Sequence, residues 1–103
     1  MQIAADLRYL DRKYIAVAGN SCEGLKVRNG TGIIGKFQGF LVDPAAHRFR
    51  FVVFELLGRL RLLPVTEARV DLDHGAIELL DEHDVRLSRP FRPEQFESLQ
   101  RYS

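Results

Sequence analysis

The side chains best suited to chemistry lie in an acidic block in the last third of the chain. Residues 67–84 hold seven Asp and Glu residues and one Arg, and His74 and His83 lie among them, in the sequences DLDHG and DEHD. Imidazole nitrogens and carboxylate oxygens are ligands of divalent metal ions, and the negative charge of the block would attract a cation. Clusters of Asp, His and Gly are also typical of exposed turns. The sequence therefore leaves two interpretations of His74 and His83 open, a metal site and a solvated acidic turn.

The single cysteine, Cys22, gives little support to catalysis. A thiol can act as a nucleophile when a His and an Asp activate it. Cys22 instead follows Ser21 and precedes Glu23-Gly24, in a loop that enters a strand, where a lone Cys is commonly a packing residue. The chain has no Gly-x-Ser-x-Gly elbow and no Gly-x-x-x-x-Gly-Lys-Ser/Thr loop. We therefore expect no catalytic residues, no cofactor, and no metal that folding requires.

Arginine and phenylalanine alternate through residues 48–51, and Arg59 and Arg61 follow. A basic strip with interleaved aromatic side chains could contact RNA phosphates and stack on RNA bases. The same alternation is expected of a strand that turns Arg to water and Phe to the core. A net charge of +1 and the absence of an RNP-type motif favour this second interpretation. RNA binding is kept as the alternative.

Strands must position these residues, because turn-forming residues recur along the chain and the apolar residues between them alternate. Asn29-Gly30 can supply the positive φ of a tight hairpin. Asp43-Pro44 predicts a second turn, since proline fixes φ and the Asp side chain can cap nearby amides. Strands are therefore expected over residues 25–28, 33–42, 48–56 and 76–80.

Two glycines explain how the strand at 33–42 could bend. By strict alternation Phe37 faces away from Phe40, so both can reach one core only if the phase slips near Gln38-Gly39. A β-bulge at Gly39 would produce this slip and curl the sheet, while Gly35 would allow a neighbouring backbone to come close. The interior is then predicted to contain Phe37, Phe40, Val42, Phe49, Phe51 and Val53.

Proline residues mark the two later parts of the chain. Pro64 cannot donate to a sheet ladder and therefore marks an edge, a strand start or a kink. In RPEQFESLQRY, Pro93 suits a first helical position, and Phe96, Leu99 and Tyr102 are spaced for one helical face. This segment is expected to form a short helix that packs on the sheet. The first fourteen residues are ambiguous between a strand and a helical turn.

The pattern from GLKVRNGTGIIGKFQGFLVDPAAHR through FRFVVFELL and RLLPVTEARVD to GAIELL resembles the PRC-barrel domain. The matching features are Gly35 with the Lys that follows it, the strand end at 40–43, and Pro64 between Leu63 and Val65. The resemblance implies a mainly β fold, a small PRC-type β-barrel of about five to six strongly bent strands with a short C-terminal helix. Residues 24–80 would form the barrel, residues 1–23 an N-terminal extension or extra strand, and residues 81–103 a C-terminal segment with the helix.

The family has no catalytic motif among these features. It occurs as the cytoplasmic part of the photosynthetic reaction-centre H subunit, as the C-terminal half of a ribosome maturation factor, and as small stand-alone proteins, which match this chain most closely. The resemblance implies a non-enzymatic binding or adaptor module that self-associates and docks onto another macromolecule. An RNA- or ribosome-associated factor is the alternative.

Composition places this module in the cytoplasm. The longest stretch without a charged residue runs from Tyr14 to Cys22, far short of the roughly 20 apolar residues of a spanning helix. The charged N-terminal sequence MQIAADLRYLDRK does not resemble a signal peptide. One cysteine excludes an internal disulfide, which is consistent with a reducing compartment.

The strand at 48–56 also predicts an interface. If Phe51 and Val53 point to the interior, then Val52, Phe54 and Leu56 point outward. These three side chains are apolar, so another part of the protein must cover them. The C-terminal helix could cover them with Phe96 and Leu99, or a second copy of the chain could do so. We predict a two-fold homodimer centred on Val52, Phe54 and Leu56.

Overall fold

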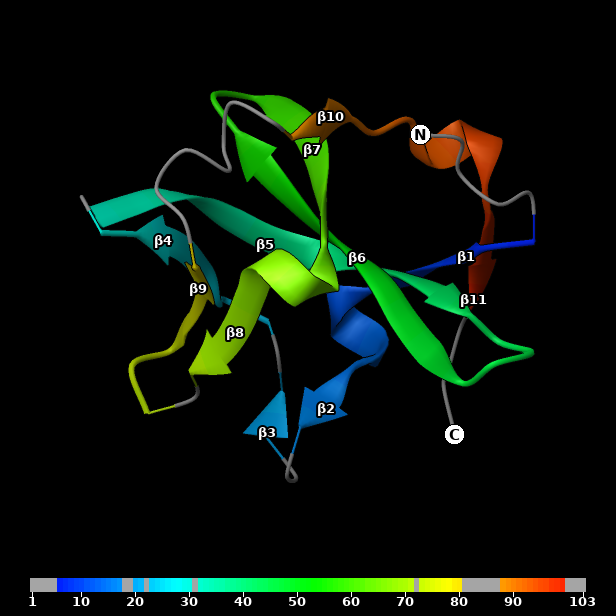
Figure 1. Cartoon of the computed structure of the whole chain (residues 1–103), viewed down its shortest axis with the longest axis horizontal. Helices are drawn as coiled ribbons and strands as arrows, with labels where there is room; N and C mark the ends of the chain where they lie inside the picture. The colour runs from blue at the N-terminus through cyan, green and yellow to red at the C-terminus, as the bar shows by residue number, and fades with distance from the viewer. Residues whose placement is uncertain are drawn as a thin grey trace.

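The computed structural model describes residues 6–17, 20–21, 23–30, 32–71, 73–80 and 88–99. Its strands are β1 (Arg8–Asp11), β2 (Ala16–Val17), β3 (Asn20–Ser21), β4 (Lys26–Asn29), β5 (Gly32–Asp43), β6 (Arg48–Leu56), β7 (Arg59–Pro64), β8 (Ala68–Asp71), β9 (Ala76–Leu79), β10 (Arg89–Pro90) and β11 (Glu97–Leu99). Three short 3₁₀ turns accompany them, namely η1 (Arg12–Tyr14), η2 (Val65–Glu67) and η3 (Pro93–Gln95). The predicted mainly β class is confirmed (Figure 1).

Two long strands, β5 and β6, form the centre of the sheet. They pair antiparallel around the expected turn, where the side chain of Asp43 accepts a hydrogen bond of 3.2 Å from the Ala46 amide. The β6–β7 hairpin turns at Leu57 and Gly58, both with positive φ, which matches the right-handed twist of the flanking strands. Local turn chemistry therefore sets the meander from β5 to β7.

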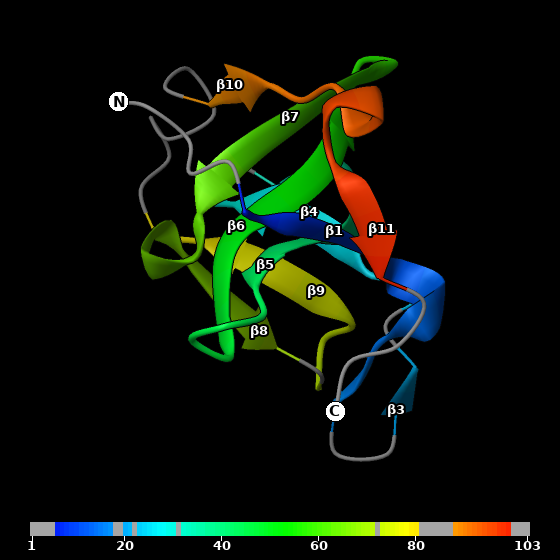
Figure 2. The same cartoon turned by 90° about the vertical axis from the view of Figure 1, so that its right-hand side faces the viewer.

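The other edge of β5 is shared by two strands. β4 pairs with its first half and β1 with its second half, from Arg8 opposite Val42 to Asp11 opposite Gly39. β11 then pairs in parallel with β1, so β1 lies between β5 and β11 (Figure 2). The C-terminal helix predicted over residues 93–102 is therefore wrong for its described part, which is one 3₁₀ turn followed by a strand. A helix this short is marginal by itself, whereas β1 offers backbone partners. Tyr102 lies outside the described residues.

The main path of strand pairing runs in the order β10-β7-β6-β5-β4-β9-β8, and within the described residues its two ends do not pair with each other. The sheet is thus curled but not closed into the predicted barrel. Pro64 ends β7, and η2 then leads the chain into β8, which pairs with β9 on the far side of the curl (Figure 1). None of the helices in the described segments is long and apolar enough to cross a membrane.

The expected phase slip in β5 is confirmed. Phe37 lies opposite Phe54 and Gly39 lies opposite Val53, so Gln38 is the extra residue of a bulge. Phe37 and Phe40 consequently share one face, and their ring centroids lie 5.1 Å apart. A Cβ added to Gly39 would clash with the carbonyl oxygen of Leu10 on β1. At Gly35 an added Cβ would clash with the carbonyl oxygen of Glu55 on β6.

A second bulge, which the sequence analysis does not predict, lies in β6 at Arg50. Leu41 pairs with Phe51 and Val42 pairs with Phe49, which leaves Arg50 as the extra residue. The bulge shifts the alternation of side chains in β6, so Phe49 and Phe51 no longer point to the same face. Phe49 stacks on Phe40, with ring centroids 4.3 Å apart. Phe51 turns to the opposite face.

Both faces of the β5–β6 pair are consequently buried. The first cluster consists of Leu10, Ile15, Leu25, Val27, Phe37, Phe40, Val42, Val52, Phe54, Leu63, Ile77 and Leu79. The second cluster consists of Leu7, Leu41, Phe51, Val53, Leu62 and Phe91. The predicted single interior is thus wrong in part, because Phe51 and Val53 belong to the second cluster.

The predicted outward-facing interface on β6 is also wrong. Val52 is 2% exposed and Phe54 is fully buried, and both belong to the first cluster. Leu56 is half-buried and packs against the same cluster. The Arg50 bulge reverses the phase on which the prediction depended. Val52 and Phe54 are covered by their own chain and are therefore not available to a second copy, whereas Leu56 keeps part of its surface exposed.

Candidate functional site

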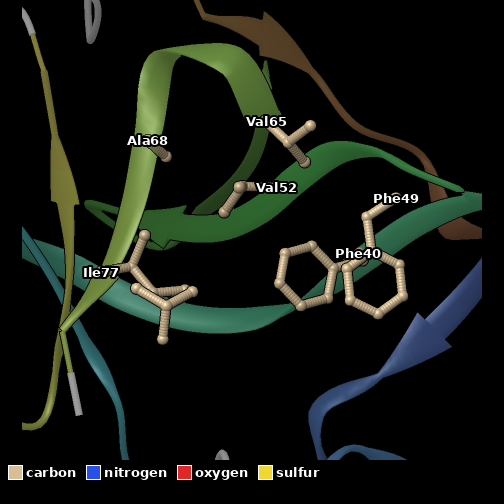
Figure 3. Close-up of a pocket in the computed structure, with 7 residues that line it drawn as sticks. Phe40, Phe49, Val52, Val65, Ala68 and Ile77 are labelled. Atoms are coloured by element: carbon tan, nitrogen blue, oxygen red, sulfur yellow. The ribbon is translucent and has the colours of Figure 1, made fainter. Parts of the chain in front are cut away.

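An apolar pocket of about 330 Å³ lies where the curled sheet remains open. Phe40 forms part of one wall from β5, and Ala68 and Val70 line it from β8 (Figure 3). Its full lining is Phe40, Phe49, Val52, Val65, Ala68, Val70 and Ile77. These side chains carry no acid, base, nucleophile or metal ligand, so the pocket can bind an apolar group by burying it from water but has no side chain for covalent chemistry.

The Arg50 bulge and η2 together form this pocket. The bulge turns Phe49 toward Phe40, so that two stacked rings form one side. Val65 in η2 and Ala68 in β8 complete the lining, because η2 carries the chain from β7 into β8 (Figure 3). Val52, from the predicted interface, also lines the pocket, whereas Phe54 and Leu56 do not.

Strand β8 borders the pocket and has one edge without a strand partner in the described segments, where it pairs with β9 alone. We call this the free edge of β8. The Leu80 amide donates to the Glu67 carbonyl at 2.9 Å, and hydrogen-bonded pairs alternate in an antiparallel ladder. Arg69 and Asp71 therefore direct their backbone groups to β9. The N–H and C=O of Val70 point to the free edge, and the residue is 39% exposed.

The outer face of β8 carries a network of ion pairs. Arg69 contacts Glu78 at 2.6 Å, and Arg28 contacts Asp71 at 3.3 Å and Glu78 at 3.7 Å. His74 adds a contact of 2.8 Å between its Nδ1 and Asp71. The hydrogen bond from the His74 side chain is the main cause that lowers the pKa of Asp71. Two of the four described acidic residues of the block, Asp71 and Glu78, are thus paired with arginine.

These contacts leave no metal centre in the part of the chain that the structure describes, where no three His, Cys, Asp or Glu side chains are grouped to hold an ion. His74 is paired with Asp71 on an exposed turn. His83 lies outside the described residues, as does Cys22. The alternative of a solvated acidic turn accounts for His74, and the structure does not place His83 beside it.

The Arg–Phe strip has no fully exposed aromatic ring. Arg48, Arg50 and Arg59 are exposed, but Phe51 is only 7% exposed and Phe49 is half-buried against Phe40. Arg61 is half-buried, and its Nε donates to the Ser88 hydroxyl at 2.8 Å. Without a fully exposed ring the strip offers charge for RNA phosphates but no platform for stacking bases.

Sequence analysis missed the free edge of β8 and the exposure of Val70. A signal was present, since Pro64 marks a break before a short strand in which Val70 stands between Arg69 and Asp71. A comparison of the chain with models of known protein families finds no match, and a search of curated proteins finds no relative. The site must therefore be interpreted from its own geometry.

Proposed function

We propose that this chain is a cytoplasmic, non-enzymatic binding module of the PRC-barrel type that self-associates through the free edge of β8. The observation that carries the proposal is the position of Val70. Its backbone N–H and C=O point to an edge without a strand partner in the described residues, and its side chain lines an apolar pocket. Exposed strand edges pair readily with other chains.

The register of such a pair follows from the backbone. In an antiparallel two-fold pair, Val70 would lie opposite Val70 of a second copy and exchange both backbone hydrogen bonds with it. Val70 would form these bonds with the groups that point to the free edge, whereas Arg69 and Asp71 direct theirs to β9. A two-fold centre on Arg69 or on Asp71 would place like charges directly opposite each other, which destabilises a strand pair.

Charge complementarity supports the same register. Centring the pair on Val70 places Arg69 of each copy opposite Asp71 of the other, in a pair without backbone hydrogen bonds where side chains approach most closely. Each opposite-charge cross-strand pair contributes about 0.2–1 kcal/mol. Arg69 is the more available of the two, since its side chain is 66% exposed although it contacts Glu78. The sequence Arg-Val-Asp is therefore complementary to itself in antiparallel order.

A dimer of this kind suits an adaptor. Two-fold symmetry presents every other surface of the module twice, which raises the apparent affinity for a partner that also carries repeated sites. The resemblance to PRC-barrel proteins supports docking onto another macromolecule. The RNA-associated alternative gains no stacking surface from the Arg–Phe strip and is not developed further.

Sedimentation velocity from micromolar to millimolar concentration tests the dimer. We expect the wild type to dimerise as concentration rises and Val70→Lys to stay monomeric, because two ammonium groups would face each other at the centre. Ile33→Lys is the matched control, since Ile33 is a β-branched strand residue that is 69% exposed on β5. It should dimerise like the wild type.

A second variant separates backbone pairing from side-chain contact. Val70→Pro removes an N–H that points away from β9, so the fold should persist while the dimer is lost. A wild type that stays monomeric at millimolar concentration contradicts the proposal. So does a Val70→Lys variant that dimerises as strongly as Ile33→Lys.

A further inference from the structure

A second, basic pocket of about 220 Å³ lies away from β8, where η1 approaches the β4–β5 pair. Its lining consists of Arg12, Gly24, Leu25, Lys26, Lys36 and Phe37. Three of these six residues are cations and none is an acid. The volume is below the roughly 300–1,000 Å³ of pockets for drug-sized ligands, so a small ligand fits it best.

Lys26 and Lys36 lie directly opposite each other across β4 and β5. The Phe37 amide donates to the Leu25 carbonyl at 3.0 Å, so the lysine pair next to it is one without backbone hydrogen bonds. Its Cα atoms are then only about 4.5 Å apart and its side chains lie close together. Like charges in this position destabilise a sheet. The fold therefore carries a repulsion that an anion between the two ammonium groups would relieve.

Among the described residues, no carboxylate forms an ion pair with either lysine, and both lysines are exposed. The nearest carboxylate in the register is that of Glu55, which lies opposite Lys36 on β6 but does not line the pocket. Glu55 thus offsets part of the charge on one side only.

Arg12 is held in place at the same pocket by the bulge in β5. One terminal nitrogen of its guanidinium donates to the Phe37 carbonyl at 3.2 Å and to Oε1 of Gln38 at 2.5 Å. The other guanidinium nitrogens make no hydrogen bond to the described residues. A planar guanidinium fixed in this way is suited to binding an oxyanion through two parallel hydrogen bonds.

We propose that Arg12, Lys26 and Lys36 form a binding site for a small phosphate-bearing anion. A phosphate dianion matches the excess of positive charge better than a monovalent carboxylate does. Arg12 would supply directional hydrogen bonds, and the two lysines would supply point charges on either side. The site is independent of the free edge of β8 and would operate in the monomer and in a dimer.

The test uses the full chain and inorganic phosphate as the probe. Two-dimensional amide NMR and thermal unfolding are followed as phosphate replaces sodium chloride at constant ionic strength. We expect the amides of residues 24–26 and 36–37 to shift in a saturable way, and the melting temperature to rise with phosphate as linkage requires. Lys26→Gln and Lys36→Gln should each weaken phosphate binding about tenfold or more, the loss expected for one charge-assisted contact.

Two further variants make the test specific. Arg59→Gln removes one exposed cation outside the pocket and should bind phosphate like the wild type. Glu55→Gln removes the carboxylate opposite Lys36 and should tighten phosphate binding. Equal protection of the wild type by phosphate and by chloride at matched ionic strength would overturn the proposal, and so would unchanged binding in both lysine variants.

Binding of a short single-stranded RNA is measured as well, because the RNA backbone also carries phosphate groups. Binding of RNA more tightly than phosphate, lost in both lysine variants, would overturn the small-anion site in favour of a polynucleotide site. RNA that binds with equal strength in wild type and lysine variants, while phosphate still distinguishes them, supports the small-anion site.

Discussion

The two hydrophobic clusters lie back to back on the β5–β6 pair, and they differ in how their outer sides are covered. The second cluster is covered by segments from both ends of the described chain, where Phe91 packs beside Tyr9 and Phe96. The Phe91 amide also donates to the Leu60 carbonyl at 3.0 Å. The first cluster instead faces η2 and β8 across a pocket. Both clusters contain Leu, Val and Phe, so backbone pairing rather than composition distinguishes the covered side from the open one.

The largest expected effect tests whether the first cluster, which faces the pocket, is packed as tightly as a hydrophobic core. Phe54→Ala should lower the free energy of unfolding by about 3–5 kcal/mol, because Phe54 is fully buried in the first cluster. Urea denaturation measures the loss, with Leu57→Ala as the exposed control. A loss below about 1 kcal/mol would mean that the first cluster is not tightly packed.

The covered side can be weakened through the contact between β5 and β1. Gly39→Ala should destabilise the fold by about 1–3 kcal/mol, since the new Cβ would collide with the carbonyl of Leu10 and displace β1. Gly30→Ala is the matched control, because a Cβ there meets no atom within 4 Å. The same denaturation experiment compares the two, and equal stability would show that β1 does not approach Gly39 closely.

Filling the pocket should cover the first cluster more completely and so make it more like the second cluster. Ala68→Leu adds apolar volume to the pocket lining and should stabilise the fold by about 0.5–2 kcal/mol, the usual gain from filling a cavity. Ala46→Leu, in an exposed turn, controls for added hydrophobicity and should change stability little. Destabilisation by Ala68→Leu would indicate that the pocket is narrower than the structure shows.

The smallest effect concerns the charged outer face of the open side. The pKa of Asp71 is lowered in the folded state, mainly by the hydrogen bond from the His74 side chain. Its carboxylate therefore stabilises the fold above its unfolded pKa of about 4, and this contribution is lost as pH falls through the lower folded pKa. The melting temperature of wild type should fall more steeply below pH 4 than that of Asp71→Asn. Parallel curves would contradict this assignment.

Features fixed by neighbouring residues were predictable from the sequence. Asp43-Pro44 specifies its turn through proline geometry and an Asp cap, and Gly39 permits the bulge that brings Phe37 and Phe40 to one face. In each case the physical cause lies within a few residues of its effect. The same locality explains why the mainly β class followed from the spacing of turns.

The candidate site was less predictable because it depends on distant strands. The Arg50 bulge contains no glycine, and it lies in residues 48–51, where Arg and Phe alternate as in a regular strand. No neighbouring residue therefore indicates a bulge at this position. Its position follows from the register with β5. The free edge of β8 likewise depends on the pairing of distant strands, which the sequence does not specify. The charges of Arg69 and Asp71 are evident in the sequence, but the sequence does not indicate what they would pair with.

The parallel pairing of β1 with β11 has a consequence for the order of folding. Arg8 and Glu97 are partners in register and form an ion pair of 3.2 Å, although they come from opposite ends of the described chain. During synthesis β1 emerges before the other strands of the sheet, and β11, which covers its outer edge, emerges after them. Closing so long a loop is slow, and contacts of high sequence separation delay folding. We therefore expect the nascent chain to expose the edge of β1 until β11 arrives, the stage at which it would be most open to aggregation or chaperone capture.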